Sequence, residues 1–270
     1  MRNFTYLSPK SLPEALRLMR EHAGRIRPLA GGTDLMVELR KDDAKLDGMD
    51  YALDLCGIPE LCGVSQEGDL LSIGSATTHD AVSRSPVLRE RAAMLADASL
   101  SVGAQQIRNV ATIGGNVANA AVAADTLSPL AALDAVVVLR NMEAERRMPL
   151  SEFVTGAGKT AIRPDELLIK IVFAPLDGYG TAFVKLGRRK ALAISRMNAA
   201  AALKIEDGQI KGARVSPGCV FASPRRVSCA EELLLGAAPS RELFEPCGKA
   251  VSDEMVRITG VRWSTEYKYP

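Results

Sequence analysis

A run of small and apolar residues around two adjacent glycines is the strongest constraint that this sequence places on its fold. The run extends from Asn109 to Asp134, and its centre is Thr-Ile-Gly-Gly-Asn at 112–116. Glycine has no Cβ atom, so backbone N–H groups at paired glycines can approach a ligand closely. Several N–H groups that converge in one turn favour phosphate or pyrophosphate. The segment therefore predicts an anion-binding turn, followed by an acid, Asp125, and a helix from about Thr126.

A second glycine pair occurs about 80 residues earlier, in the sequence Leu-Ala-Gly-Gly-Thr-Asp at 29–34. The apolar run 26–30 predicts a buried strand before it, and 35–40 predicts a short helix after it, capped by Thr33 or Asp34. The N-terminal dipole of that helix would point at an anion held by the glycines. The two segments would then grip one dinucleotide from both sides, whereas the plainer interpretation makes them ordinary tight turns.

Charge and composition exclude several classes of function. The 270 residues carry 34 basic and 32 acidic side chains, without the basic excess that contact with nucleic-acid phosphates requires. The longest apolar stretch, 117–139, is interrupted by polar residues, so no membrane span is expected. The five cysteines are odd in number and lack the spacing of zinc or iron–sulfur sites. We expect buried free thiols, no metal site in this chain, and a cytoplasmic protein.

Hydrophobic periodicity predicts a mixture of helices and strands. Ser11 and Glu14 have the spacing of a capping box at the start of a helix with one apolar face. Further helices are expected at 89–102, 231–235 and 243–257, and strands at 51–55, 70–74, 135–139, 167–173 and 219–222.

Turn-forming residues divide the chain. Asp207-Gly208 separates two apolar runs and predicts a β-hairpin over 198–215. Helix and strand breakers cluster at 175–180, after a predicted strand, and indicate a linker. The expected division is a first domain at 1–175, with lobes at about 1–57 and 58–175, and a second domain at 176–270.

Motifs of other nucleotide-binding and hydrolytic enzymes are missing. Gly-Ala-Gly-Lys-Thr at 156–160 resembles the end of a Walker A loop, but Phe153 stands where the first glycine is required, so we expect a surface loop. Gly-x-Gly-x-x-Gly and Gly-x-Ser-x-Gly are both absent. His79 is expected to be a partly exposed residue at a helix start rather than a point of covalent flavin attachment. The basic cluster of Lys185 and 188–190 is expected to be a solvated face.

Both glycine segments belong to longer stretches that resemble one protein family. Ala-Gly-Gly-Thr-Asp-Leu at 30–35, TIGGNVANA at 112–120 and AADTLSPLAALDA at 123–135 resemble the FAD-binding subunit of molybdenum hydroxylases, the family of xanthine dehydrogenase and carbon monoxide dehydrogenase. The resemblance covers nearly the whole chain, including 183–189 and 259–263. It implies an α+β fold: a two-lobed FAD-binding domain of the vanillyl-alcohol oxidase type, followed by a small α+β C-terminal domain.

The resemblance also implies which residues hold FAD. The two glycine segments would hold the pyrophosphate and the adjoining ribose or ribityl groups, and Asp125 would bond the sugar chain. Leu168 and Lys185 match family positions at the flavin or adenine. No catalytic acid, base or nucleophile is expected, because the redox chemistry belongs to the cofactor. The expected set is Leu29, Ala30, Gly31, Gly32, Thr33, Asp34, Ala111, Thr112, Ile113, Gly114, Gly115, Asn116, Asp125, Leu168 and Lys185.

The family works as a complex, so the resemblance implies partners. An iron–sulfur subunit with [2Fe–2S] clusters and a molybdenum-cofactor subunit would complete a heterotrimer, in which FAD receives electrons and passes them to NAD or another acceptor. One alternative is a self-contained FAD-dependent oxidase or dehydrogenase, although no clear substrate domain or covalent-flavin motif supports it. The other is a non-catalytic nucleotide-binding or assembly module, which would bind no flavin.

Overall fold

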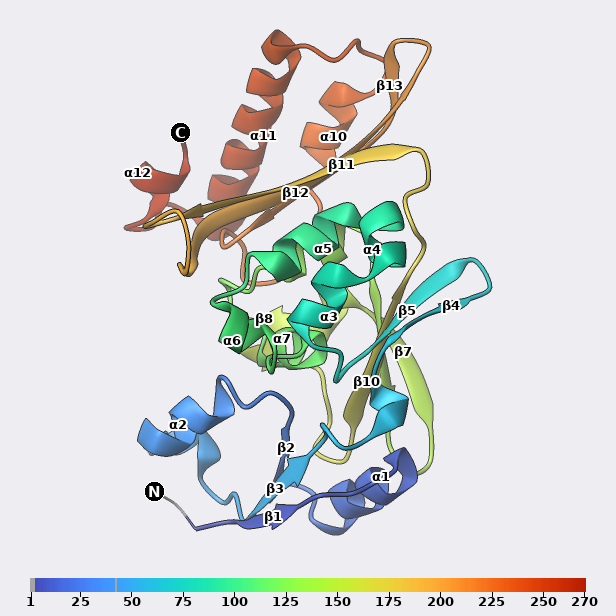
Figure 1. Cartoon of the computed structure of the whole chain (residues 1–270). Helices are drawn as coiled ribbons and strands as arrows, with labels where there is room; N and C mark the ends of the chain where they lie inside the picture. The colour runs from blue at the N-terminus through green and yellow to red at the C-terminus, as the bar shows by residue number, and fades with distance from the viewer. Residues whose placement is uncertain (1–2, 42) are drawn as a thin grey trace.

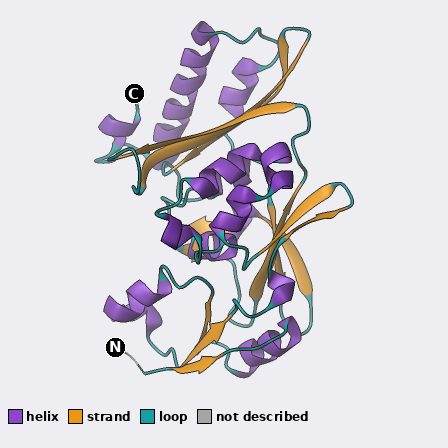
Figure 2. Cartoon of the chain, viewed as in Figure 1, coloured by secondary structure: helices purple, strands orange, loops and turns teal. Residues whose placement is uncertain are grey.

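Three larger β-sheets, each accompanied by its own helices, follow one another along the described part of the chain from its N-terminal to its C-terminal region (Figure 1), and a fourth sheet has only two strands. The computed structural model describes residues 3–41 and 43–270. Helices and strands are mixed throughout these residues (Figure 2), which confirms the expected α+β class. None of the helices in the described part of the chain has the length and apolar character that crossing a membrane requires.

The first sheet, here the N-terminal sheet, is parallel and has the order β1-β3-β2. Its strands are β1 (Thr5–Leu7), β2 (Ile26–Leu29) and β3 (Tyr51–Asp54). The connecting helices are α1 (Leu12–Glu21) and α2 (Leu35–Lys41), with short 3-10 turns at Ala44–Leu46 and Pro59–Leu61. The predicted strand and helix on either side of the first glycine pair are therefore both present.

Local sequence explains both helices of this sheet. The Ser11 side chain caps α1 by accepting a hydrogen bond from the Glu14 N–H at 3.4 Å, as the capping box predicts. The expected apolar face of α1 is buried. In α2 the expected side-chain cap is wrong: within residues 3–41 and 43–270, neither Thr33 nor Asp34 makes a side-chain hydrogen bond. Backbone carbonyls accept the hydrogen bonds at the start of this helix instead. The Met36 N–H, for example, donates to the Gly32 carbonyl oxygen at 3.0 Å.

The central sheet is antiparallel, with the order β4-β5-β10-β6-β7. The middle strand, β10, is buried on both faces. A β-bulge between Leu168 and Lys170 shifts its register. One core cluster therefore takes Leu167, Ile169 and Val172 from β10, and another takes Leu168, Ile171 and Phe173. The strands are β4 (Val64–Glu67), β5 (Leu70–Gly74), β6 (Val136–Arg140), β7 (Glu145–Pro149) and β10 (Leu167–Phe173). A small hairpin of β8 (Val154–Gly156) and β9 (Lys159–Thr160) lies beside it.

Seven short helices accompany the central sheet, and they differ from expectation at two places. The helix expected at 89–102 is broken at Ala92, whose φ of −152° separates α4 from α5. Gly114 and Gly115 lie in the first turn of a helix, α7, rather than in an open turn. The helices are α3 (His79–Arg84), α4 (Pro86–Arg91), α5 (Ala93–Leu100), α6 (Gln105–Arg108), α7 (Ile113–Asn119), α8 (Leu127–Ala132) and α9 (Leu150–Phe153).

The third sheet, here the C-terminal sheet, is a long antiparallel meander. Asp207 and Gly208 form the predicted turn, with φ values of 50° and 73°. The strand expected at 219–222 is wrong, because Cys219 has a φ of 67° and the chain leaves the sheet there. The elements are β11 (Tyr179–Gly187), β12 (Ser195–Glu206), β13 (Gln209–Gly218), α10 (Ser228–Leu234), α11 (Arg241–Thr259) and α12 (Thr265–Lys268).

A buried ion pair ties β7 to the turn before β10. Arg146 donates to both carboxylate oxygens of Glu166, with Nε–Oε1 at 2.6 Å and the second bond at 2.8 Å, and the Arg163 N–H donates to the same carboxylate. Glu166 is only 3% exposed. Burial raises its pKa, but the hydrogen bonds from Arg146 and Arg163 outweigh burial, so the net pKa is lowered. The carboxylate is therefore held ionised in the folded protein.

We expect Glu166→Gln to lower the free energy of unfolding by about 2 kcal/mol, because the partly buried guanidinium of Arg146 loses its counter-charge. Urea unfolding followed by circular dichroism measures this loss. Glu245→Gln is the control, since Glu245 forms an exposed pair with Arg241 and its removal should change stability by less than about 0.5 kcal/mol. Equal stability of the two variants would show that the Arg146–Glu166 pair stabilises the fold no more than an exposed ion pair does.

Candidate functional site

The two glycine segments, far apart in the chain, touch each other in the structure. A Cβ atom on Gly31 would lie 2.1 Å from the carbonyl oxygen of Val110 and 2.6 Å from the Cα of Ala111. Side-chain carbon atoms are not found at such distances, so only glycine allows this approach of backbone to backbone. The next residue, Gly32, has a φ of 69°, which glycine adopts at little cost.

The first segment presents backbone donors that the described part of the chain leaves unpaired. Among residues 3–41 and 43–270, no hydrogen-bond partner is found for the N–H groups of Gly31, Gly32, Thr33 and Asp34. Leu29, at the end of β2, is anchored by its carbonyl, which accepts from the Leu55 N–H at 2.9 Å. Backbone N–H groups left free at a strand-to-helix turn suit an anionic ligand.

The second segment uses its donors internally. The Gly114 N–H donates to the Ser75 carbonyl at 2.9 Å, and the Gly115 N–H donates to the Thr112 hydroxyl, which caps α7, at 3.0 Å. A Cβ on Gly114 would lie 2.5 Å from the Ser75 side chain. The expectation that the segment 111–116 holds part of a ligand stays a prediction, and the Gly114 and Gly115 N–H groups already have partners inside the protein. The glycine at 114 permits close packing of α7 against the end of β5.

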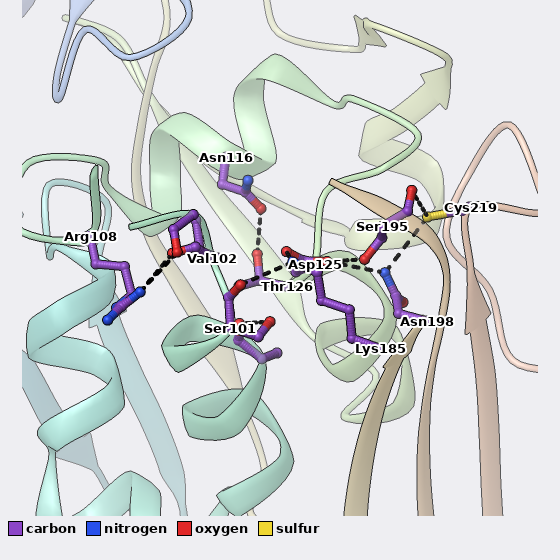
Figure 3. Close-up of polar contacts among 12 residues, drawn as sticks. Ser101, Val102, Arg108, Asn116, Asp125, Thr126, Lys185, Ser195, Asn198 and Cys219 are labelled. Atoms are coloured by element: carbon purple, nitrogen blue, oxygen red, sulfur yellow. Dashed lines mark hydrogen bonds and ion pairs between the residues drawn. The ribbon is translucent and has the colours of Figure 1, made fainter. Parts of the chain in front are cut away.

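Asp125 lies at the centre of a buried polar cluster (Figure 3). It is 6% exposed, and its Oδ2 atom accepts from Lys185 Nζ at 2.6 Å. Lys185 Nζ also donates to the carbonyl of Ser101 at 2.9 Å, and the Ser195 hydroxyl donates to Asp125 Oδ1. Two expected site residues thus form one ion pair. The solvated face expected for the basic cluster applies only to residues 188–190, which are exposed.

Asn116 and Leu168, two further expected residues, lie within α7 and behind it. Asn116 Oδ1 accepts from the Thr126 hydroxyl at 2.6 Å, which joins α7 to the residue after Asp125 (Figure 3). Leu168 is 5% exposed and belongs to the same core cluster as Ile113. Its side chain therefore lies in the core behind α7.

Sequence reasoning missed three residues that support this site. Ser75 packs against Gly114, while Ser195 and Asn198 both donate to Asp125 Oδ1, Asn198 across a longer distance of 3.5 Å. Ser195 and Asn198 are buried polar residues at the start of a strand that continues with four alanines, 199–202. Buried polar groups in an apolar strand need partners, and this pattern is the signal that could have identified them.

His79 is buried, with 1% of its surface exposed, so the expected partly exposed position is wrong. Its backbone N–H donates to the carbonyl of Ala111 at 2.9 Å, which ties α3 to the second glycine segment. Its Nδ1 atom has no hydrogen-bond partner among the residues that the structure describes. Burial, with a smaller contribution from the charge of Arg108, lowers the pKa of His79 to about 4.

The cysteines divide into two groups. Cys219 and Cys247 are buried, whereas the expectation of buried thiols is wrong for Cys56, Cys62 and Cys229, which are exposed. Burial, together with the nearby charge of Asp125, raises the pKa of Cys219 to about 11. This thiol is therefore neutral at physiological pH and acts as a packing residue beside Asn198.

Two family models match the chain on either side of the expected linker. The FAD binding domain in molybdopterin dehydrogenase matches residues 2–175, and the CO dehydrogenase flavoprotein C-terminal domain matches residues 182–269. The free donors at the first glycine segment and the contact at Gly31 fit a dinucleotide with a doubly charged pyrophosphate. These properties define the class of the protein: a FAD-binding flavoprotein of the oxidoreductases.

Individual relatives narrow this class. The chain is 33% identical to the nicotinate dehydrogenase FAD-subunit of Eubacterium barkeri, over 99% of this chain and 92% of that protein. It is 29% identical to the xanthine dehydrogenase FAD-binding subunit of Escherichia coli, over 98% and 90%. A crystal structure of Cu,Mo-CO dehydrogenase superposes with a TM-score of 0.89 and 28% identity, over 99% of this chain and 93% of that one. The chain belongs to the family of FAD-binding medium subunits of molybdenum hydroxylases.

Proposed function

We propose that FAD lies across the contact between the two glycine segments, with its pyrophosphate at 29–34 and 111–116 and its sugar chain at Asp125. The observation that carries this proposal is the approach of Gly31 to the backbone of Val110 and Ala111, beside four N–H groups that have no partner among residues 3–41 and 43–270. Lys185, paired with Asp125, and Leu168, behind α7, complete the proposed set. The proposed FAD-binding domain comprises residues 1–175, in lobes 1–57 and 58–175, and residues 176–270 form the proposed second domain.

We further propose that the chain is the electron-transfer subunit of a xanthine dehydrogenase-like heterotrimer in the cytoplasm. It would take electrons from an iron–sulfur subunit with [2Fe–2S] clusters and deliver them to NAD or another acceptor, while a molybdenum-cofactor subunit oxidises the organic substrate. Support comes from relatives that are named as subunits of nicotinate and xanthine dehydrogenases. When bound, FAD supplies the redox chemistry, whereas the residues of this chain bind and orient it.

Purification from the native host tests both proposals. We expect a yellow-brown complex that contains this chain and two others, with the absorption of flavin and of iron–sulfur clusters. Addition of the organic substrate should bleach both absorptions, and addition of the acceptor should restore them. The isolated chain should retain FAD but should not oxidise the substrate.

Other outcomes would contradict these proposals. A single chain that binds FAD and oxidises a substrate alone would instead be a self-contained oxidase or dehydrogenase. A colourless chain that takes up no added FAD would mean that the glycine segments serve only as structural turns. The Gly248→Ala variant, purified in the same way, is the control for loss of FAD during purification. A Cβ on Gly248, in α11, has open space around it, so this variant should retain FAD.

A further inference from the structure

The side chains that hold Asp125 come from the C-terminal sheet and not from the chain around Asp125 itself. Lys185 lies on β11, and Ser195 and Asn198 lie on β12. All three donate to the Asp125 carboxylate, at 2.6, 2.5 and 3.5 Å. Ser195 is 6% exposed and Asn198 is 4% exposed, so water does not compete strongly for these bonds.

The amide of Asn198 has its own supports. Its Oδ1 atom accepts from the Ser128 hydroxyl at 2.6 Å, and its Nδ2 atom also lies 3.7 Å from Cys219 Sγ (Figure 3). Opposite it on β13, a Cβ on Gly218 would lie 2.0 Å from Asn198 Oδ1. The glycine leaves the space that this amide fills. The side chain is thereby held with its donor toward Asp125 and its acceptor toward Ser128.

An ionised carboxylate can accept about four hydrogen bonds. Lys185, Ser195 and Asn198 use three of these places from one side, because they come from adjacent strands of one sheet. The acceptor position of the Asp125 carboxylate that remains unused therefore points in one fixed direction. Because the carboxylate is already immobilised, it loses little rotational entropy when it binds a sugar hydroxyl. The affinity for the ligand is therefore higher.

We propose that Ser195 and Asn198 are positioning residues for FAD: the C-terminal sheet sets the orientation of Asp125, and so sets the affinity of the preceding part of the chain for the cofactor. The inference rests on the proposed role of Asp125 in FAD binding. It assigns a function to two residues that make no direct contact with the cofactor in this proposal. It also gives the C-terminal sheet a part in cofactor retention.

The first test is Ser195→Ala in the full-length chain, with FAD affinity measured by quenching of flavin fluorescence. We expect FAD to bind about tenfold more weakly, because one hydrogen bond to a charged group is lost. Ser195→Thr keeps the hydroxyl and should restore most of the affinity. The matched control is Ser216→Ala, which removes the hydroxyl of another buried serine in the same sheet. This hydroxyl donates to the Arg225 carbonyl at 3.0 Å. This control should bind FAD as the wild type does.

A second variant disturbs Asn198 without removing any polar group. Gly218→Ala places a methyl group against Asn198 Oδ1, and the amide must move away from its present position. We expect weaker FAD binding here as well. The visible circular dichroism of bound flavin should change in Gly218→Ala and Ser195→Ala but not in Ser216→Ala, although all three lower the melting temperature of the FAD-free protein.

Asp125→Asn separates this inference from the proposed function. Combined with Asp125→Asn, the substitution Ser195→Ala should cause no further loss of affinity, since Ser195 acts through the carboxylate. If Asp125→Asn alone binds FAD as the wild type does, the proposed role of Asp125 fails and the inference fails with it. If Asp125→Asn loses FAD but Ser195→Ala and Gly218→Ala retain it, only the inference is overturned.

Discussion

Gly31→Ala should abolish the retention of FAD while leaving most of the fold in place. The added methyl group would stand 2.1 Å from the Val110 oxygen, and both contact partners are backbone, which cannot rotate away as a side chain can. The two glycine segments must therefore separate. If the pyrophosphate lies where we propose, separation would remove hydrogen bonds to its charge, and we expect FAD to bind at least about 100-fold more weakly.

The measurement for Gly31→Ala is the dissociation constant of FAD, with far-ultraviolet circular dichroism as a check of the fold. Gly248→Ala is the matched control, because a Cβ there meets nothing within 4 Å. Gly114→Ala is an instructive contrast: its methyl group would press on Ser75, so it should lower the melting temperature of the FAD-free chain more than Gly31→Ala does. Wild-type affinity in Gly31→Ala would disprove the proposed FAD position.

Stability should fall on acidification from about pH 6.5 to pH 4 because of His79. The folded protein lowers the pKa of His79 from 6.5 to about 4, so within this window the unfolded chain binds the proton and the folded protein does not. The contribution of His79 to stability is therefore fully present above the unfolded pKa and is lost as the pH falls toward the folded value. Below pH 4 the accumulated loss should reach about 3 kcal/mol.

The difference between wild type and His79→Gln isolates this contribution, because the carboxylates that also titrate in this range are common to both proteins. Urea unfolding at a series of pH values should give a steeper dependence for the wild type. His22→Gln is the control, since it removes the other imidazole and leaves His79 in place. Parallel curves for wild type and His79→Gln would show that the buried imidazole does not oppose protonation.

Local elements could be predicted from sequence wherever the determining contacts lie within a few residues. The Ser11 cap of α1 and the Asp207-Gly208 turn depend on their own neighbours in the chain, and both are present. Helix α7 was not predicted, because glycine pairs disfavour helices in isolation. Its first turn contacts Ser75 through the Gly114 N–H, and Ser75 lies in the turn after β5, far from α7 in the sequence.

Elements that depend on distant packing were the ones predicted incorrectly. The break at Ala92 interrupts an apolar period that continues on both sides of it, so periodicity alone indicated one helix. The polypeptide after β13 has strand-like residues, but Cys219 turns the chain with a positive φ. Tertiary contacts can impose such conformations on residues whose local preferences point elsewhere.

The sequence alone was enough to single out the two glycine segments and Asp125, and to predict the strand and the helix on either side of the first glycine pair. Backbone sterics and short-range periodicity, on which these predictions depend, are local properties. Tertiary structure alone decided which N–H groups remain free: those of 31–34 have no partner among the described residues, and those of Gly114 and Gly115 are used inside the protein. It also decided the surroundings of Asp125. Its partners lie 60, 70 and 73 residues further along the chain, and only the packing of the C-terminal sheet against the α5–α8 region brings them to one carboxylate.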